Sequence, residues 1–254
     1  MVTCGKNDGQ PEKPLKWELV WEDHFDQSGL PDHKIWDYEV GYVRNNELQY
    51  YAKNRIENSR VENGNLVIEA RKDKWNGHEI TSASLQTYRK KHILYGRIEV
   101  RAKLPTGRGT WPAIWMLGTT IKDGTHWPGC GEIDIMENVG FDPDLIHANI
   151  HTKAYNHVMK TNKGNRITIP QPYDSYHVYA LEWFPDHMDF FVDNHKYFTF
   201  QNEGGWEKWP FDKEHYLIIN LAIGGSWGGQ KGVDDSIFPQ KYLIDYVKVY
   251  KQAL

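Results

Sequence analysis

The chain contains 254 residues, of which 34 are acidic and 30 are basic, so its formal net charge is −4. A chain of this length is sufficient for one large all-β domain with a substantial core. The near-balance of charge argues against nucleic acid or an anionic membrane as the main partner, and no run approaches the roughly 18 apolar residues of a membrane span. The aromatic content is high, with 11 Trp, 15 Tyr and 9 Phe, which predicts that some rings lie at a surface and stack on a ligand.

Residues 1–14 are polar, contain Pro and Gly and show no periodicity, so we expect a tail or linker ahead of a single domain at 15–254. Cys4 resembles the lipid-modified cysteine of a mature bacterial lipoprotein, and the alternative is a tail cysteine without a role. We do not expect a disulfide with the only other cysteine, Cys130, because it would tie the tail to a Gly-rich segment. The resulting hypothesis is a secreted or cell-surface protein that is anchored through Cys4.

From residue 15 onward the dominant periodicity is two. In the segment 96–104, GRIEVRAKL, apolar and charged residues alternate as in a half-buried strand. Further strands are expected at 66–71, 80–88, 113–117, 133–137, 146–152, 177–183, 188–192, 216–222 and 243–250. They are short and separated by turn residues, and no segment has ten residues of helical spacing. The sequence therefore predicts an antiparallel β-sandwich or jelly roll.

Three acids lie among apolar residues in the segment 131–138, GEIDIMEN. Glu132 and Asp134 are two residues apart and share one face of a strand. Glu137 would point to the other face of a regular strand, but one extra residue at a β-bulge returns it to the same face. Concentrating three like charges raises the proton affinity of at least one carboxyl group, and two carboxyl groups with separate protonation roles are the machinery of glycoside hydrolysis. The alternatives are a structural cation site and a solvent-facing cluster.

Tryptophans surround these acids in the sequence. Trp111 and Trp115 precede them, Trp127 lies just before them, and Trp227 lies within the Gly-rich segment GGSWGG. Such rings suit a sugar cleft, because an indole stacks on the apolar face of a pyranose. The alternative for a single Trp is core packing, which we expect for Trp17, Trp36, Trp75 and Trp183.

Two histidines, His147 and His151, are four residues apart in a predicted strand and therefore share a face. We expect His151 to form a hydrogen bond with an acid or with the sugar, and His147 to be structural. A divalent metal held by these histidines and the acids is a weaker alternative, since imidazole and carboxylate together suit zinc or iron.

Several ordered blocks of the sequence resemble glycoside hydrolase family 16, in particular its laminarinase-like members. The resemblance runs from about residue 17 to residue 251, and the main blocks are NNELQYY (45–51), YGRIEVRAKLPTGRGTWPAIWMLG (95–118), WPGCGEIDIMENVG (127–140) and YLIINLAIGGSWGG (216–229). It implies a β-jelly-roll sandwich of two antiparallel sheets with a concave substrate cleft. It also implies endo-hydrolysis of a β-glucan with retention of configuration, with no cofactor required for the chemistry.

The resemblance also implies roles for individual residues. Glu132 matches the family nucleophile, Glu137 the general acid/base, and Asp134 the carboxylate between them. The residue His151 matches a histidine near the acid/base. Positions that hold glucosyl units in the cleft match Asn45, Trp111, Trp115 and Trp227.

The family often binds one structural calcium, and the matching positions are Glu22, Gly64 and Asp245. Asp245 lies within an otherwise apolar strand pattern, which independently makes it a candidate ligand. We therefore expect a structural calcium on the convex side, away from the cleft.

The expected substrate is β-1,3-glucan (laminarin) or mixed-linkage β-1,3/1,4-glucan, and we expect a monomer. Within the family the six-residue EIDIME spacing goes with laminarinases, agarases and carrageenases, and a five-residue spacing with lichenases and xyloglucan-active enzymes. No basic cluster accompanies the motifs, which favours a neutral glucan. Ser226 and Gly228 replace the Asn and Pro of many laminarinases, a change that favours a wider linkage preference. A transglycosylase and a non-catalytic glucan-binding module on the same fold are the alternatives.

Overall fold

The structure is a computed structural model, and it describes residues 15–253. Almost all regular structure is β. The strands are β1 Trp17–Asp23, β2 Asp37–Tyr38, β3 Gln49–Tyr51, β4 Ser59–Glu62, β5 Asn65–Ala70, β6 Ile80–Ser82, β7 Ser84–Gln86, β8 His92–Ile93, β9 Gly96–Lys103, β10 Thr110–Gly118, β11 Glu132–Val139, β12 Asp142–His151, β13 Lys163–Thr168, β14 His177–Trp183, β15 His187–Val192, β16 His195–Gln201, β17 His215–Ile223 and β18 Gln240–Gln252. Two short 3₁₀ helices, Thr119–Asp123 and Asp235–Ile237, complete the set, and no helix among the described residues is long and apolar enough to cross a membrane.

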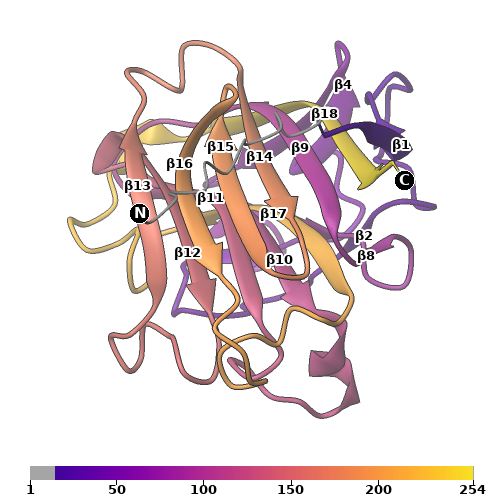
Figure 1. Cartoon of the computed structure of the whole chain (residues 1–254). Coiled ribbons are helices and arrows are strands. Elements are labelled where there is room, and N and C mark those ends of the chain that lie inside the picture. The colour runs from indigo at the N-terminus through magenta and orange to yellow at the C-terminus, as the bar shows by residue number, and fades with distance from the viewer. Residues whose placement is uncertain (1–14, 254) are drawn as a thin grey trace, which may run out of the picture.

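The strands form two large sheets that lie face to face (Figure 1). One sheet has the order β16-β15-β14-β9-β18-β5-β4, with β1 also paired to β18. The other has the order β13-β12-β11-β10-β17-β7-β2, with β8 also paired to β17. Neighbouring strands in both sheets are antiparallel, so the predicted antiparallel sandwich is confirmed. A small third sheet pairs β3 with β6 in parallel.

The core lies between the two large sheets and takes its side chains from alternate positions of each strand. In β9, Ile98, Val100 and Ala102 are fully buried, whereas the charged residues between them are partly exposed. Equivalent apolar residues of β10, β11, β12 and β17 fill the other side of the same cluster. Burial of apolar surface between the layers, about 25 cal/mol per Å², is the main stabilising contribution of this arrangement. The opposite face of the second sheet is thereby left for polar side chains.

The sequence prediction was wrong or incomplete where strands are short or polar. The single strand expected at 80–88 is two strands, β6 and β7, which separate at Ala83 and join different sheets. The edge strand β13 was not predicted, because its sequence KGNRIT is almost entirely exposed and carries no apolar alternation. An edge strand pairs with a neighbour on one side only and buries little of its surface, so its sequence carries no period-two pattern of apolar residues.

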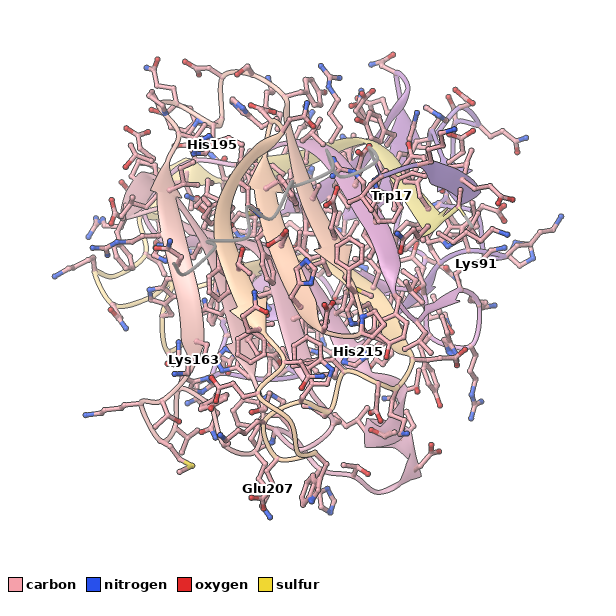
Figure 2. The ribbon with its side chains drawn as sticks, viewed as in Figure 1. Trp17, Lys91, Lys163, His195, Glu207 and His215 are labelled. Atoms are coloured by element: carbon pink, nitrogen blue, oxygen red, sulfur yellow. The ribbon has the colours of Figure 1, made fainter. Side chains whose placement is uncertain are left out.

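His215, at the start of β17, is labelled in Figure 2. It is fully buried, its ring lies beside those of Trp183 and Phe211, and it neighbours Gly131 just before β11. Its Nδ1 donates to the carbonyl oxygen of Lys213 at 2.9 Å, and burial lowers the pKa of the imidazole to about 4. The neutral ring is therefore the native form.

We expect His215→Gln to reduce the loss of unfolding free energy that occurs as the pH falls from neutral to about 4. Because the native pKa lies below the ordinary value, the stabilisation by the neutral ring is complete above about pH 6.5 and is lost as the pH falls through about 4, a difference of about 3 kcal/mol. Thermal unfolding between pH 7 and pH 4 measures this effect, with the partly exposed His187 changed to Gln as the control. Parallel curves for wild type and His215→Gln would contradict the expectation.

Candidate active site

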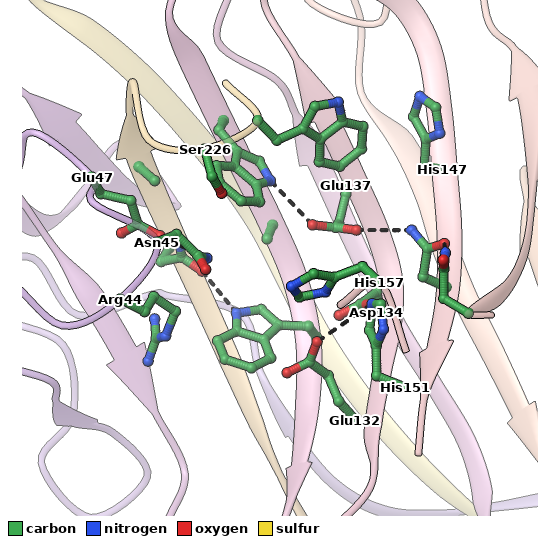
Figure 3. A pocket seen from close by; sticks show the side chains of 18 of the residues that line it. Arg44, Asn45, Glu47, Glu132, Asp134, Glu137, His147, His151, His157 and Ser226 are labelled. Carbon is green, nitrogen blue, oxygen red and sulfur yellow. Dashed lines mark hydrogen bonds and ion pairs between the residues drawn. The ribbon is translucent and has the colours of Figure 1, made fainter. Parts of the chain in front are cut away.

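A pocket of about 500 Å³ opens on the outer face of the second sheet, over β10, β11, β12 and β17 (Figure 3). All three acids of the EIDIME segment line it, together with every cleft residue that the resemblance implied. The full set is Arg44, Asn45, Glu47, Trp111, Ala113, Trp115, Glu132, Asp134, Glu137, His147, Asn149, His151, His157, Asn162, Asn220, Ala222, Ser226, Trp227 and Gln230. Residues from four adjacent strands and three loops thus converge on one cavity.

The pairing of β10 with β11 shows the bulge that the spacing predicted. Trp115 pairs with Asp134 and Ile114 with Met136, so Ile135 has no partner in β10. The pairing with β12 shifts at the same place, since Asp134 faces Asn149 and Glu137 faces His147. Residue 135 is therefore the extra residue, and it returns Glu137 to the face that carries Glu132 and Asp134.

Glu132 is held by an indole and lies close to an imidazole. Trp127 donates its Nε1–H to Glu132 Oε2 at 3.0 Å. The imidazole Nε2 of His151 lies 3.7 Å from Glu132 Oε1 and 3.3 Å from Asp134 Oδ2. His151 faces Glu132 directly in the β11–β12 ladder, so the register of two strands fixes this contact. The resemblance had suggested a histidine beside the acid/base, whereas these contacts place His151 beside Glu132 and Asp134.

Glu137 is fixed by two donors from neighbouring strands. Trp111 donates its Nε1–H to Oε1 at 3.1 Å, and Asn149 donates its amide to Oε2 at 3.0 Å. The side chain is almost completely buried, with 8% of its surface exposed. Both carboxylate oxygens are therefore oriented before any ligand arrives.

The pKa values of all three carboxyl groups are raised. Burial raises the pKa of Glu132 to about 8, and the charge of Asp134 adds to this, while His151 opposes it. Burial also raises the pKa values of Asp134 and Glu137, and the charge of Glu137 raises that of Asp134 further. The cluster therefore retains a proton near neutral pH, as general acid catalysis requires.

We expect Glu132→Gln to stabilise the fold at neutral and alkaline pH. Since the native pKa of Glu132 is raised, its carboxyl group favours folding below about pH 4.5 and loses that contribution as the pH rises through about 8. The variant should therefore have the same melting temperature as wild type near pH 4.5. At pH 8 its melting temperature should be higher than that of wild type, by about 2–4 °C for each kcal/mol of added stability. Scanning calorimetry at the two pH values checks this. Glu62→Gln is the control, because Arg60 lowers the pKa of the exposed Glu62 carboxyl group.

Tryptophans and their supporting amides build the walls of the pocket. Trp115 donates its Nε1–H to Asn220 Oδ1 at 2.8 Å and is 7% exposed, and the guanidinium of Arg44 lies 4.8 Å above its ring. The rings of Trp111 and Trp227 meet edge to face with centroids 5.6 Å apart. Ser226 donates its backbone N–H to the carbonyl oxygen of Asn45 at 2.9 Å, which ties the Gly-rich loop to the rim.

His147, which we expected to be structural, lines the pocket, and its ring packs against Trp227 edge to face with centroids 5.0 Å apart. It faces Glu137 across the ladder, and a directly opposed pair shares one face of a sheet. Sequence reasoning also missed other lining residues, namely Arg44, Glu47, Asn149, His157 and Asn220. Asn149 had a usable signal, since it lies between two histidines on the same face of the strand pattern. The others come from loops or separate strands, where periodicity gives no guidance.

The expected calcium ligands lie at the other sheet, and the two acids among them have cationic neighbours. Asp245 Oδ2 accepts from Arg101 Nη1 at 2.5 Å. Glu22 Oε2 lies 2.9 Å from His24 Nε2 and 3.6 Å from Lys248 Nζ. Gly64 lies in the turn between β4 and β5. The carboxylate of Asp245 is thus paired with the guanidinium of Arg101, and binding of calcium by Asp245 would require this ion pair to open.

Comparison with known proteins decides the family. A family model described as glycosyl hydrolases family 16 matches residues 46–248. The chain belongs to glycosyl hydrolases family 16. The beta-glucanase of Rhodothermus marinus is 52% identical over 94% of this chain and 87% of its own length. The resemblance in the sequence motifs is therefore confirmed.

Solved structures of family 16 members have the same fold. The laminarinase from Rhodothermus marinus superposes with a TM-score of 0.92 at 50% identity, covering 95% of this chain and 100% of that chain. A non-specific endo-beta-1,3(4)-glucanase from the family, SCLam, gives a TM-score of 0.89 at 50% identity and covers 93% of this chain and 92% of that chain. The predicted jelly-roll sandwich is confirmed, and the family 16 chain is a glycoside hydrolase.

Proposed function

We propose that this family 16 protein is a retaining endo-β-glucanase that hydrolyses β-1,3-glucan, mixed-linkage β-1,3/1,4-glucan or both. The observation that carries the proposal is the bulge at Ile135, which places Glu132 and Glu137 on one face of β11 inside a Trp-lined pocket. Two carboxyl groups on the same face, one proton-bearing and one nucleophilic, are what double displacement at a glycosidic bond requires.

The roles are those that the family resemblance implies for each acid. Glu137 gives its proton to the departing glycosidic oxygen while a Glu132 oxygen attacks the anomeric carbon and forms a glycosyl ester. Glu137, now ionised, then takes a proton from water, whose oxygen attacks the anomeric carbon and releases Glu132. Two inversions give net retention.

Asp134 and His151 act on the nucleophile. Asp134 lies on the same face, and burial raises its pKa, so it holds a proton beside Glu132. His151, close to both carboxyl groups, lowers the pKa of Glu132 and so favours its ionised form. Together they let Glu132 ionise for attack although the cavity disfavours charge.

The linkages of the products test the substrate proposal. Laminarin and barley-type glucan are digested in parallel, and the linkage at each new reducing end is determined. The proposal expects internal cleavage with the β configuration kept, and cleavage of β-1,4 bonds next to β-1,3 units would establish mixed-linkage activity. The names of two similar proteins, a beta-glucanase and a non-specific endo-beta-1,3(4)-glucanase, support this range.

Transglycosylation is the second candidate, because the glycosyl ester can pass its sugar to a second sugar instead of water. Product analysis at high oligosaccharide concentration separates the two outcomes, since chains longer than the substrate appear only on transfer. A non-catalytic glucan-binding module is disfavoured, as all three acids are present and two carry dedicated indole donors.

We also propose that the protein works outside the cytoplasm, since a polysaccharide substrate does not cross membranes. A second proposal is that it is a monomer. The lipid-anchor hypothesis concerns Cys4, which lies outside the described residues. Fatty-acid labelling of the full gene product, with Cys4→Ser as the control, tests this hypothesis.

Calcium binding near Asp245 stays a prediction. A melting temperature that is equal in calcium and in chelator would refute it.

A further inference from the structure

Three side chains of the active site, those of Glu132, Asp134 and His151, bring possible metal-ligand atoms close together. One oxygen from each of Glu132 and Asp134 and one nitrogen of His151 all lie within 4.8 Å of one another. Two of these separations involve His151 Nε2, which lies 3.3 Å from Asp134 Oδ2 and 3.7 Å from Glu132 Oε1 (Figure 3). Such convergence of two carboxylates and an imidazole is the chemistry of a metal site.

Neither carboxylate oxygen accepts a hydrogen bond within the described part of the chain, and both groups release their protons when a metal binds. Glu132 uses Oε2 to accept from Trp127, which leaves Oε1 turned toward His151. Asp134 is 4% exposed, and its Oδ2 accepts no hydrogen bond within the described part of the chain. Glu137, by contrast, has both oxygens engaged by Trp111 and Asn149, so it is not a ligand. The buried and unpartnered Asp134 oxygen is the second observation, independent of the clustering, that points to a ligand.

The two separations from His151 Nε2 match those in a tetrahedral zinc site. Zinc binds nitrogen and oxygen at about 2.0–2.2 Å, so two ligands of a tetrahedron lie about 3.3–3.6 Å apart. The separations of 3.3 Å and 3.7 Å from His151 Nε2 lie at this value or just above it. Because the three residues line the pocket, the fourth position opens toward the cavity.

We propose that the substrate-free active site binds one zinc ion through Glu132 Oε1, Asp134 Oδ2 and His151 Nε2, and that this ion inhibits hydrolysis reversibly. Imidazole and carboxylate suit zinc better than the hard cations calcium and magnesium, which prefer oxygen alone. The bound ion takes the Glu132 lone pair that attacks the anomeric carbon. It also occupies part of the space of the sugar, so metal and glucan exclude one another.

A binding measurement tests the site without reference to activity. Cobalt(II) replaces zinc as the probe, and its visible absorption reports tetrahedral coordination. We expect these bands in the wild-type protein and their loss in both Glu132→Gln and Asp134→Asn, with circular dichroism confirming that each variant is folded. The control is His187→Ala, because His187 also neighbours two acids, Asp186 at 2.8 Å and Asp189 at 3.7 Å, but through opposite ring nitrogens. Bands that are absent from wild type, or that persist in both acid variants, would overturn the proposal.

Kinetics test the inhibition, and this part rests on the proposed glucanase activity. With free zinc at about ten times its dissociation constant, kcat/KM for laminarin should fall about tenfold. The fall should come through KM, be reversed by chelator, and be the same in His187→Ala. Inhibition that lowers kcat alone, or none at saturating cobalt binding, would refute the competitive site. Failure of the glucanase proposal itself would show as inactivity in chelator, with the cobalt bands unaffected.

Discussion

Replacement of Glu132 by glutamine is expected to abolish glucan hydrolysis while the protein still binds oligosaccharide. The amide has the size of the carboxylate and still accepts from Trp127 through its oxygen, so the pocket keeps its shape. The amide lacks the negatively charged carboxylate oxygen that attacks the anomeric carbon. We expect kcat to fall by about 10⁴-fold or more, as for other nucleophiles of covalent catalysis.

The measurement pairs hydrolysis with binding. Reducing-sugar release from laminarin gives the activity, and calorimetric titration with a laminari-oligosaccharide gives the affinity. Glu62→Gln, an exposed glutamate of β4, serves as the matched control and should retain full activity. Retained hydrolysis by Glu132→Gln would remove Glu132 from the mechanism, whereas loss of binding together with activity would indicate a damaged pocket.

Replacement of Glu137 by alanine should produce a different defect that an external nucleophile repairs. Without the acid, cleavage of a glucan with its poor leaving group should fall by about 10²–10⁴-fold. An aryl glucoside with a good leaving group still forms the glycosyl ester on Glu132, which then persists because no base activates water. Azide needs no base. It attacks the anomeric carbon, displaces Glu132 and gives a glycosyl azide.

The configuration of that product distinguishes the two acids. Two successive inversions give a β-glycosyl azide from Glu137→Ala, and nuclear magnetic resonance identifies it. An α-azide would mean direct displacement and would exchange the roles assigned to Glu132 and Glu137. Asn149→Ala is the informative companion, because it removes only one donor to Glu137 and should lower activity without responding to azide.

The sequence predicts the long central strands of the two sheets better than the short strands and the edge strands, because burial leaves a pattern in the sequence. The central strands are buried on at least one face, so β9 alternates apolar and charged residues while β10 and β17 are almost continuously apolar, and the acids at 132, 134 and 137 stand out within β11. The bulge could be inferred because side-chain direction in a strand depends on parity alone. Short strands such as β2 and edge strands such as β13 bury too little to leave a pattern.

The rest of the site depends on register, which a single sequence does not contain. His147 was expected to be structural because its partner strand was unknown, and only the pairing with Glu137 turns it toward the pocket. Likewise Asn220 supports Trp115 from a strand 105 positions away. Arg44 and Glu47 reach the pocket from a loop whose path periodicity cannot specify.

The unpaired Ile135 also bears on how this active site can change by mutation. Loss of one residue from a strand normally inverts every side chain beyond it and destroys the sheet. Here a deletion of codon 135 would leave Asp134 opposite Trp115 and Met136 opposite Ile114, since both pairs already exist on either side of the bulge. The strand would straighten, and both glutamates would still face the cavity. We therefore expect this active site to tolerate a one-codon deletion at position 135, a change that would shift side chains to the wrong face at most other positions of a strand.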